Sequence, residues 1–330
     1  ALTELTELIL DASGLTAIPE TIGNLQKLKL LSIASNSISL LPEKIVDLVN
    51  LEVLLISSNN ILYLPENIGN LTKLMKLDVA NNMLMTLPDN IGSLNQLTDL
   101  FLENNQINVL PATFADLSNL IELRLYSNKL AELPESFGGF DDLLNLYLNN
   151  NQLSRLSDNF GSMNNLKRLR LNSNKLDFLQ GSIGNLENLE ELWLQGNQLV
   201  TLPAEIGDLD SLKYLYLDNN QLEWLPDELC NIYSRLEVFS ANNNSLCPLA
   251  VPDDCVSYEN DVGNQNCSIT GCPPHHFERE GYCVYESDYD ILQDFLDLNP
   301  ESQSLVEPAG VPNNASRCVN EYWWHGGRLV

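Results

Sequence analysis

The residues best suited to metal chemistry gather near one end of the chain. Its three histidines are His275, His276 and His325, and six of its seven cysteines follow residue 246. The segment Cys272-Pro-Pro-His275-His276, with Cys283 beyond it, contains the side chains that zinc prefers as ligands. Its spacing matches no established zinc finger, and cysteines this close together favour disulfide bonds. We therefore expect no metal site and no cofactor.

Catalytic groups are sparse elsewhere in the chain. The sequence contains no Gly-rich phosphate loop and no HExxH or GxSxG motif. Catalysis would instead need a paired acid and base or an activated nucleophile. Glu122 and Glu191 are conceivable members of such a pair, but nothing distinguishes them from neighbouring carboxylates. The sequence thus predicts a protein that is not an enzyme.

A period of 23 residues organises most of the chain. Each repeat carries an Asn, with apolar residues five and three positions before it and two positions after it, as in LIELRLYSNKL at 120–130. A repeat of this length indicates a solenoid, in which each unit buries its apolar face against its neighbours. The repeated residues are Asn36, Asn59, Asn82, Asn105, Asn128, Asn151, Asn174, Asn197 and Asn220, followed after a 24-residue step by Asn244.

Each repeat should contain one short strand and one return segment. The LxL core alternates with period two, as a strand does. Eight of the ten connecting segments contain a Pro after the last apolar residue, which suits a turn out of the strand because Pro fixes φ and lacks an N–H. The amide of the repeated Asn both donates and accepts, so we expect it to pair with backbone groups at each bend. This pattern predicts eleven strands within residues 1–246.

The motif LxxLxLxxNxL, with LPxxIGNLxxL between copies, resembles the leucine-rich repeat family over residues 2–246. The resemblance implies an α/β solenoid shaped as a right-handed horseshoe. A parallel β-sheet would line its concave face, and short helical or extended segments its convex face. The segment Glu228–Cys267 is similar to the end of the repeats in extracellular bacterial members. Ala1 lies inside the first repeat, which leaves open whether a capping segment precedes it.

Residues 247–330 lack the period and form a Cys-rich acidic tail with 14 Asp and Glu. Cysteines clustered at the end of a solenoid predict a disulfide-stapled cap in an oxidising compartment, although reduced thiols in a cytosolic protein are the alternative. The pairing stays open, because seven cysteines leave one without an internal partner. The disulfide candidates are Cys230, Cys247, Cys255, Cys267, Cys272 and Cys283.

The net charge of −28 excludes some partners. Nucleic acids and anionic membrane surfaces would repel such a chain. The sequence also has no run of about 18 apolar residues that would span a bilayer. Together with the cysteines, these features predict a protein that is secreted or located at a cell surface.

Residues between the apolar positions of each strand should point out of the sheet, onto its concave face. In the later repeats these positions hold aromatic and Arg residues, which dominate interface hot spots. We expect Tyr147, Arg170, Trp193 and Tyr216 to form one row across neighbouring strands. The expected ligand-binding residues are Phe101, Arg124, Tyr126, Tyr147, Arg168, Arg170, Trp193, Tyr214, Tyr216 and Asp218. The alternative is that these side chains stack across strands and stabilise the sheet.

These observations favour a non-enzymatic recognition module that binds a protein ligand through its concave face. A second hypothesis is a structural or adhesive protein that self-associates as a homodimer through an apolar patch at Ile9, Leu30, Val53 and Leu55. An upstream cap could equally cover that patch. A third hypothesis is glycan binding, in which the aromatic rings stack on sugars. The sequence does not name the ligand.

Overall fold

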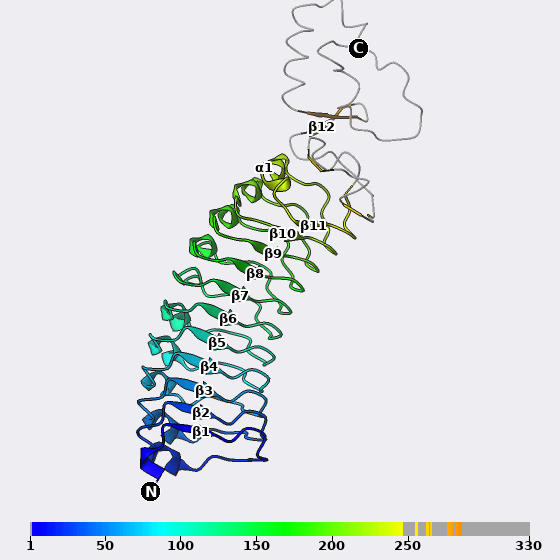
Figure 1. Ribbon diagram of the computed structural model, residues 1–330. Helices are drawn as coiled ribbons and strands as arrows, with labels where there is room; N and C mark the ends of the chain where they lie inside the picture. The colour runs from blue at the N-terminus through cyan, green and yellow to red at the C-terminus, as the bar shows by residue number, and fades with distance from the viewer. Residues whose placement is uncertain are drawn as a thin grey trace, which may run out of the picture.

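Short strands stacked side by side build a curved solenoid (Figure 1). The computed structural model describes residues 2–246, 255–256, 262–263, 265, 276–279 and 282–285. One parallel sheet contains eleven strands in chain order. This confirms the predicted horseshoe with a single parallel sheet. The strands are β1 Glu7–Ile9, β2 Leu30–Ser32, β3 Val53–Leu55, β4 Lys76–Asp78, β5 Asp99–Phe101, β6 Glu122–Arg124, β7 Asn145–Tyr147, β8 Arg168–Arg170, β9 Glu191–Trp193, β10 Tyr214–Tyr216 and β11 Val238–Ser240.

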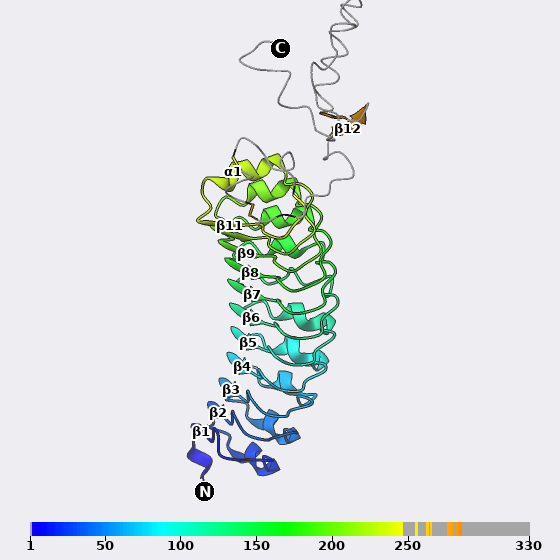
Figure 2. The same cartoon turned by 90° about the vertical axis from the view of Figure 1, so that its right-hand side faces the viewer.

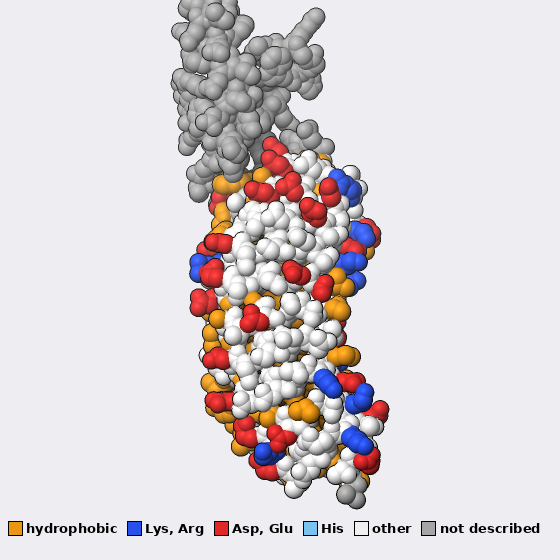
Figure 3. Space-filling model, turned by 90° about the vertical axis from the view of Figure 1, so that its left-hand side faces the viewer, with side chains coloured by type: hydrophobic (Ala, Val, Ile, Leu, Met, Phe, Trp, Pro, Cys, Tyr) orange, Lys and Arg blue, Asp and Glu red, His pale blue; other side chains and the backbone are white. Residues whose placement is uncertain are grey.

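The return segments of the repeats contain short 3-10 helices, most of them directly preceded by Pro. Pro42 and Pro88 have φ of −68° and −62°, the values that their rings favour. Figure 3 shows the helical side of the solenoid, where few charged side chains lie in the middle. The 3-10 helices are η1 Leu2–Glu4, η2 Glu20–Asn24, η3 Glu43–Asp47, η4 Ile68–Asn70, η5 Asp89–Ser93, η6 Ala112–Asp116, η7 Phe160–Ser162, η8 Gly181–Asn185, η9 Ala204–Asp208 and η10 Asp227–Leu229.

Two shorter elements complete the described structure. The α-helix α1, Cys230–Tyr233, follows η10 directly at the end of the repeats. Strands β12 His276–Arg279 and β13 Tyr282–Tyr285 pair antiparallel in a separate sheet. Within the described residues, no helix combines the length and apolar character that crossing a membrane requires.

Apolar residues of every repeat fill the interior between the strands and the return segments. Leu100, Leu123 and Leu146 occupy the middle of successive strands and are fully buried. Gly138 allows close stacking of the return segments, because a Cβ there would lie 1.9 Å from the backbone oxygen of Asn159 in the next repeat. The period of the sequence thus becomes a period of contacts between neighbouring repeats.

The repeated Asn side chains form hydrogen bonds with the backbone of their own repeat and of the preceding repeat. The Oδ1 atom of Asn128 accepts a hydrogen bond from the N–H of Ile107 at 3.0 Å. Its Nδ2 atom donates to the carbonyl oxygens of Leu102 at 2.9 Å and Leu125 at 3.1 Å. Equivalent bonds form along the ladder from Asn36 to Asn244. These amides satisfy backbone groups that the bends would otherwise leave unpaired.

The residue before each Asn has a left-handed conformation that the sequence pattern did not predict. Ser127 has a φ of 55° and Asn150 has the same value. In the ninth repeat the position is Gly196, with a φ of 66°. Small residues and Asn tolerate this region better than bulky ones, which accounts for their presence before the ladder residues.

A Gln continues the ladder past the last regular repeat. Gln265 accepts from the N–H of Leu246 at 3.3 Å and donates to the carbonyl of Ala241 at 2.7 Å. These partners occupy the same places in their repeat as those of the Asn residues in theirs. Val262 is fully buried against the same end. This short segment therefore adds a further layer over β11.

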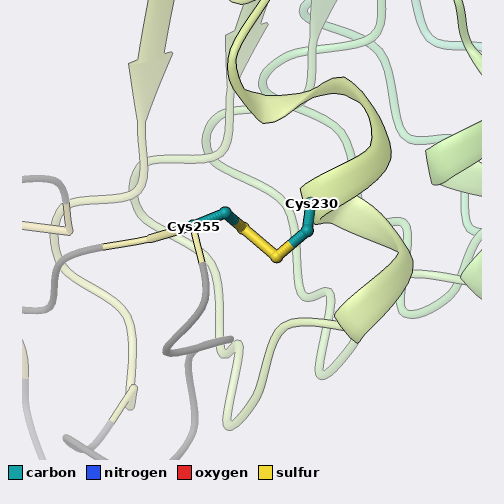
Figure 4. The surroundings of a disulfide bond; sticks show 2 residues. All are labelled: Cys230 and Cys255. Atoms are coloured by element: carbon teal, nitrogen blue, oxygen red, sulfur yellow. A yellow bond between two sulfur atoms is a disulfide. The ribbon is translucent and has the colours of Figure 1, made fainter.

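One disulfide bond joins the last repeat to the chain beyond it. Cys230, the first residue of α1, is bonded to Cys255, and their Cα atoms are 5.4 Å apart (Figure 4). Both were among the disulfide candidates. Of the others, Cys247, Cys267 and Cys272 lie outside the described residues, and Cys283 lies on β13, for which only the backbone is described.

Candidate ligand-binding surface on the concave face

The strand register aligns the third residue of each strand with its counterparts on both neighbours. Arg124 is opposite Tyr147, Tyr147 opposite Arg170, and Arg170 opposite Trp193. Tyr216 follows on β10. Because neighbouring strands are about 5 Å apart, these side chains are within contact distance. In Figure 2 the strands that carry this row lie side by side along one edge of the solenoid.

The row alternates between cationic and aromatic side chains in its middle section. The Nζ atom of Lys76 and the Cζ atom of Arg124 lie 4.5 Å and 4.2 Å from the centre of the Phe101 ring. The Cζ atom of Arg124 is also 6.0 Å from the centre of the Tyr147 ring. Such pairs contribute about 0.5–2 kcal/mol each, depending on exposure. We call this series, together with Lys76 from the first position of β4, the cation–aromatic ladder; its members are Lys76, Phe101, Arg124, Tyr147, Arg170, Trp193 and Tyr216.

The later half of the ladder is formed by Arg170 and the rings around it. Its Cζ atom is 5.2 Å from the centre of the Tyr147 ring and 4.3 Å from that of Trp193. The rings of Trp193 and Tyr216 have centres 4.6 Å apart and are tilted by 50°. All four side chains are partly exposed. The stacking that we considered as an alternative is therefore present, and it leaves a rigid surface open to solvent.

Phe101 differs from our expectation. We expected it to contribute to a ligand-binding surface, but it is only 8% exposed. The cationic groups of Lys76 and Arg124 both lie over its ring. Long cationic side chains bury their aliphatic parts on apolar surfaces in this way. Phe101 therefore supports Arg124 from below and offers almost no surface to a ligand.

Two carboxylates surround Arg124. A terminal nitrogen of Arg124 lies 2.5 Å from Glu122 and another lies 3.8 Å from Glu103. Partial burial opposes the charge of Arg124, but these ion pairs outweigh it and raise its pKa. Burial also raises the pKa of Glu103, which is 6% exposed and has one oxygen, Oε2, buried without a hydrogen-bond partner.

Arg168 and Tyr214 lie on the first position of their strands, beside the ladder rather than in it. The Nε atom of Arg168 donates to Glu191 at 3.0 Å, and this bond raises the pKa of Arg168. The hydroxyl of Tyr214 donates to Glu237 at 2.5 Å, which raises the pKa of Tyr214. Both side chains are thus already engaged within the sheet.

The remaining two expected residues flank the other side of the ladder. Asp218 accepts hydrogen bonds from the backbone N–H of Asn242 at 2.9 Å and from its side chain at 2.7 Å. This ties Asp218 to the neighbouring repeat. Burial is the main cause of a raised pKa for Tyr126, and the nearby Glu103 adds to it.

A small pocket opens on the ladder between the two arginines. It has a volume of about 320 Å³ and is lined by Arg124, Tyr126, Tyr147, Asn149 and Arg170. Our sequence interpretation missed Asn149. The repeat pattern could have identified it, because Asn149 occupies the same position of its repeat as Tyr126. An Asn at that position is not distinctive in a chain that is rich in this residue.

The apolar patch at the first repeats is not continuous along the register. Ile9 is 61% exposed, whereas Leu30, Val53 and Leu55 are only partly exposed. Leu30 is opposite Val53, but Ser32 separates Ile9 from Leu55.

In the described part of the chain, no three His, Cys, Asp or Glu side chains form a group that could hold a metal ion.

Comparisons with known proteins match the repeats. The family described as leucine-rich repeat region matches residues 1–86, and the family described as leucine rich repeat matches residues 164–222. No curated protein matches the chain. A leucine-rich repeat protein of Leptospira interrogans of known structure is 30% identical, with 71% of each chain covered and a TM-score of 0.47.

Two receptors of known structure are also similar. A TDR receptor is 30% identical over 74% of this chain and 44% of its own, with a TM-score of 0.67. The Arabidopsis receptor kinase HAESA, in complex with the peptide hormone IDA and the co-receptor SERK1, is 25% identical over 74% of this chain and 46% of its own, with a TM-score of 0.59. The chain thus spans less than half the length of these receptors. Since two family models match separate parts of one continuous repeating sheet, the chain belongs to the leucine-rich repeat family.

Proposed function

We propose that this protein is a non-enzymatic recognition module that works outside the cell or at its surface. It holds a protein or peptide ligand on the concave face, over the later part of the cation–aromatic ladder. The observation that carries this proposal is the partly exposed series Tyr147, Arg170, Trp193 and Tyr216, whose members contact one another across four strands. Aromatic and Arg side chains of this kind dominate the binding energy of interfaces.

The rigidity of the surface supports binding. Arg170 is held between Tyr147 and Trp193, which the strand register places on either side of it, so little side-chain freedom remains to be lost there when a ligand binds. Ligands bind more tightly to surfaces whose side chains are already ordered before binding, because less conformational entropy is then lost. HAESA, a similar protein, binds a peptide hormone and a co-receptor, and the Cys230–Cys255 disulfide agrees with an oxidising compartment.

Selected peptides provide a direct test. A displayed peptide library is panned on the protein, and the affinities of the selected peptides are measured for Trp193→Ala, Tyr216→Ala and the unsubstituted protein. Each substitution should weaken binding by about 2 kcal/mol or more, which is roughly 30-fold. Tyr63→Ala is the matched control, because Tyr63 is an aromatic residue with 56% exposure that lies outside the strands, between β3 and η4. Circular dichroism would verify that the variants are folded. Unchanged affinity in both ladder variants would refute the proposal.

A further inference from the structure

The residues immediately before the strands form a continuous row along one edge of the solenoid. The N–H of Ile121 donates to the carbonyl oxygen of Thr98 at 2.8 Å, and the N–H of Leu144 donates to that of Ile121 at 2.9 Å. Bonds of this kind link each member to the next, so neighbours are about 5 Å apart. We call this row the entry edge; its members are Lys29, Glu52, Met75, Thr98, Ile121, Leu144, Lys167, Glu190 and Lys213.

The middle of the entry edge is largely apolar and partly exposed. Met75 and Ile121 are 46% and 41% exposed, and Leu144 is partly exposed. A hollow of about 560 Å³ opens beside Ile121 and Leu144. Polar residues form the rest of its lining, namely Gln96, Thr98, Asn119, Asp142 and Asn165. Exposed apolar surface bordered by polar side chains is typical of sites where another macromolecule binds.

Charged residues flank this apolar middle in a complementary order. Counted outward from the centre, one side carries Glu52 and then Lys29, and the other carries Lys167 and then Glu190. Opposite charges therefore lie at equal distances on the two sides of the centre. Lys29 pairs with Glu52 at 2.7 Å and Lys167 with Glu190 at 3.9 Å, but all four side chains remain at least 35% exposed. They are accessible to charges on a second molecule.

A second row, two residues before the entry edge in each repeat, has the same kind of order. Lys73 and Asp142, both exposed, lie in the repeats of Met75 and Leu144 and are equally far from the centre. Five of the nine lysines of the chain lie in the two rows: Lys27, Lys29, Lys73, Lys167 and Lys213. Because the net charge is −28, this edge repels a second copy less than the acidic remainder of the chain does.

We propose that two copies of this chain associate through their entry edges, antiparallel about a two-fold axis that passes between Thr98 and Ile121. Met75 of each copy then faces Leu144 of the other and the hollow beside it, which a flexible Met side chain can fill. This interface is distinct from the apolar patch of the first repeats.

The order of the charges favours a second copy over a different protein as the partner. A two-fold axis brings the same surface of both copies together, so one chain must supply both members of every contact. A different protein would require no such symmetry in this chain. The ion pairs formed between the copies are Glu52 with Lys167, Lys29 with Glu190 and Lys73 with Asp142, each formed twice.

This arrangement goes beyond the proposed function and does not depend on it, because the entry edge and the cation–aromatic ladder are different surfaces. The axis is perpendicular both to the strands and to the direction in which they stack, so the two concave faces open to the same side. The contact extends along nine strands, which is about 40 Å. Two ladders then lie side by side and present two sites to one ligand.

Sedimentation velocity of the full chain tests the proposal, after alkylation of free thiols to prevent disulfide-linked dimers. The unsubstituted protein should form a reversible dimer whose fraction rises with concentration. Ile121→Asp should raise the dissociation constant of the dimer by about tenfold or more, because it places two negative charges at the apolar centre. A protein that stays monomeric up to about 300 µM would overturn the inference.

Charge reversals test the antiparallel register. Glu52→Lys and Lys167→Glu should each raise the dissociation constant of the dimer by about tenfold or more, because each change turns two attractive pairs into repulsive ones. The double variant should restore the dimer, since both pairs are attractive again with their signs exchanged. A mixture of the two single variants should also dimerise, because each pair between them then joins opposite charges.

Lys175→Glu is the matched control, because Lys175 is exposed directly after Asn174, beyond the carboxyl ends of the strands and thus on the opposite edge. It changes the net charge as Lys167→Glu does but should leave the dissociation constant unchanged. Circular dichroism would verify that the variants are folded. Equal weakening by Lys175→Glu, or a double variant that dimerises as weakly as the single ones, would overturn the inference.

Discussion

The guanidinium carbon of Arg170 lies 4.3 Å from the centre of the Trp193 ring, directly across two neighbouring strands. This contact stabilises the sheet and also fixes both side chains in the orientation in which a ligand would meet them. Because the same pair serves both purposes, stability and binding can be measured separately in variants of these two residues.

A double-mutant cycle on Arg170 and Trp193 should reveal a favourable coupling. We expect about 0.5–1 kcal/mol between Arg170→Met and Trp193→Leu, measured as free energies of unfolding in urea, because the pair is partly exposed. A cycle between Arg170→Met and Tyr63→Leu should show no coupling, since Tyr63 lies away from the ladder. If the changes in free energy of unfolding caused by Arg170→Met and Trp193→Leu were additive, the contact would contribute nothing to stability.

Phe101→Ala should act on stability rather than on ligand binding. The buried ring fills the space beneath Lys76 and Arg124, so its removal should lower the free energy of unfolding by about 3 kcal/mol. Peptide affinity in the folded variant should change less than in Trp193→Ala. A large loss of affinity with unchanged stability would restore Phe101 as a binding residue.

Asn128→Leu should destabilise the solenoid by about 1–3 kcal/mol for each backbone group that it leaves unpaired. The N–H of Ile107 loses its bond to Asn128, whereas the carbonyls of Leu102 and Leu125 keep bonds from the side chains of Asn105 and Asn151. Asn119→Leu is the control, because Asn119 is exposed and donates to a single backbone oxygen. Thermal or urea unfolding would compare the two, and equal losses would contradict the role of the buried ladder.

Glu103→Gln should change how stability depends on pH. Burial raises the pKa of Glu103 above the ordinary value of 4.5, so the folded protein retains this proton at a pH where the unfolded chain has lost it. The associated stability is present below about pH 4.5 and is lost as pH rises through the folded pKa. Relative to the unsubstituted protein, Glu103→Gln should therefore gain free energy of unfolding as pH rises above 4.5. Urea unfolding at a series of pH values from 4.5 upward measures the gain, and a difference between the two proteins that does not change with pH would contradict the prediction.

Loss of the Cys230–Cys255 disulfide should loosen one end of the molecule only. The bond closes a segment of 25 residues, which corresponds to about 3.5 kcal/mol of chain entropy. Each repeat contacts only its neighbours. Cys230→Ser should therefore speed amide hydrogen exchange around α1 and β11, and leave β1 to β5 unchanged. Faster exchange along the whole solenoid would contradict this prediction.

The 23-residue period determined the fold because it determines which residues stack. Leu100 and Leu123 are buried and paired in register as their spacing predicted. The same spacing placed Tyr147, Arg170 and Trp193 on adjacent strands. Local sequence patterns suffice for such features, since every repeat meets a copy of itself at a fixed distance.

Only the tertiary structure decided how each side chain is used. The covering of Phe101 by two cations, and the pairing of every described Arg side chain except Arg170, depend on rotamers that a period does not specify. Gln265 follows Asn244 by 21 residues and is a different amino acid, so its place in the ladder was invisible in the repeat pattern. The choice of Cys255 as the partner of Cys230 likewise required the chain to be folded, because disulfide pairing depends on distances in space rather than along the sequence.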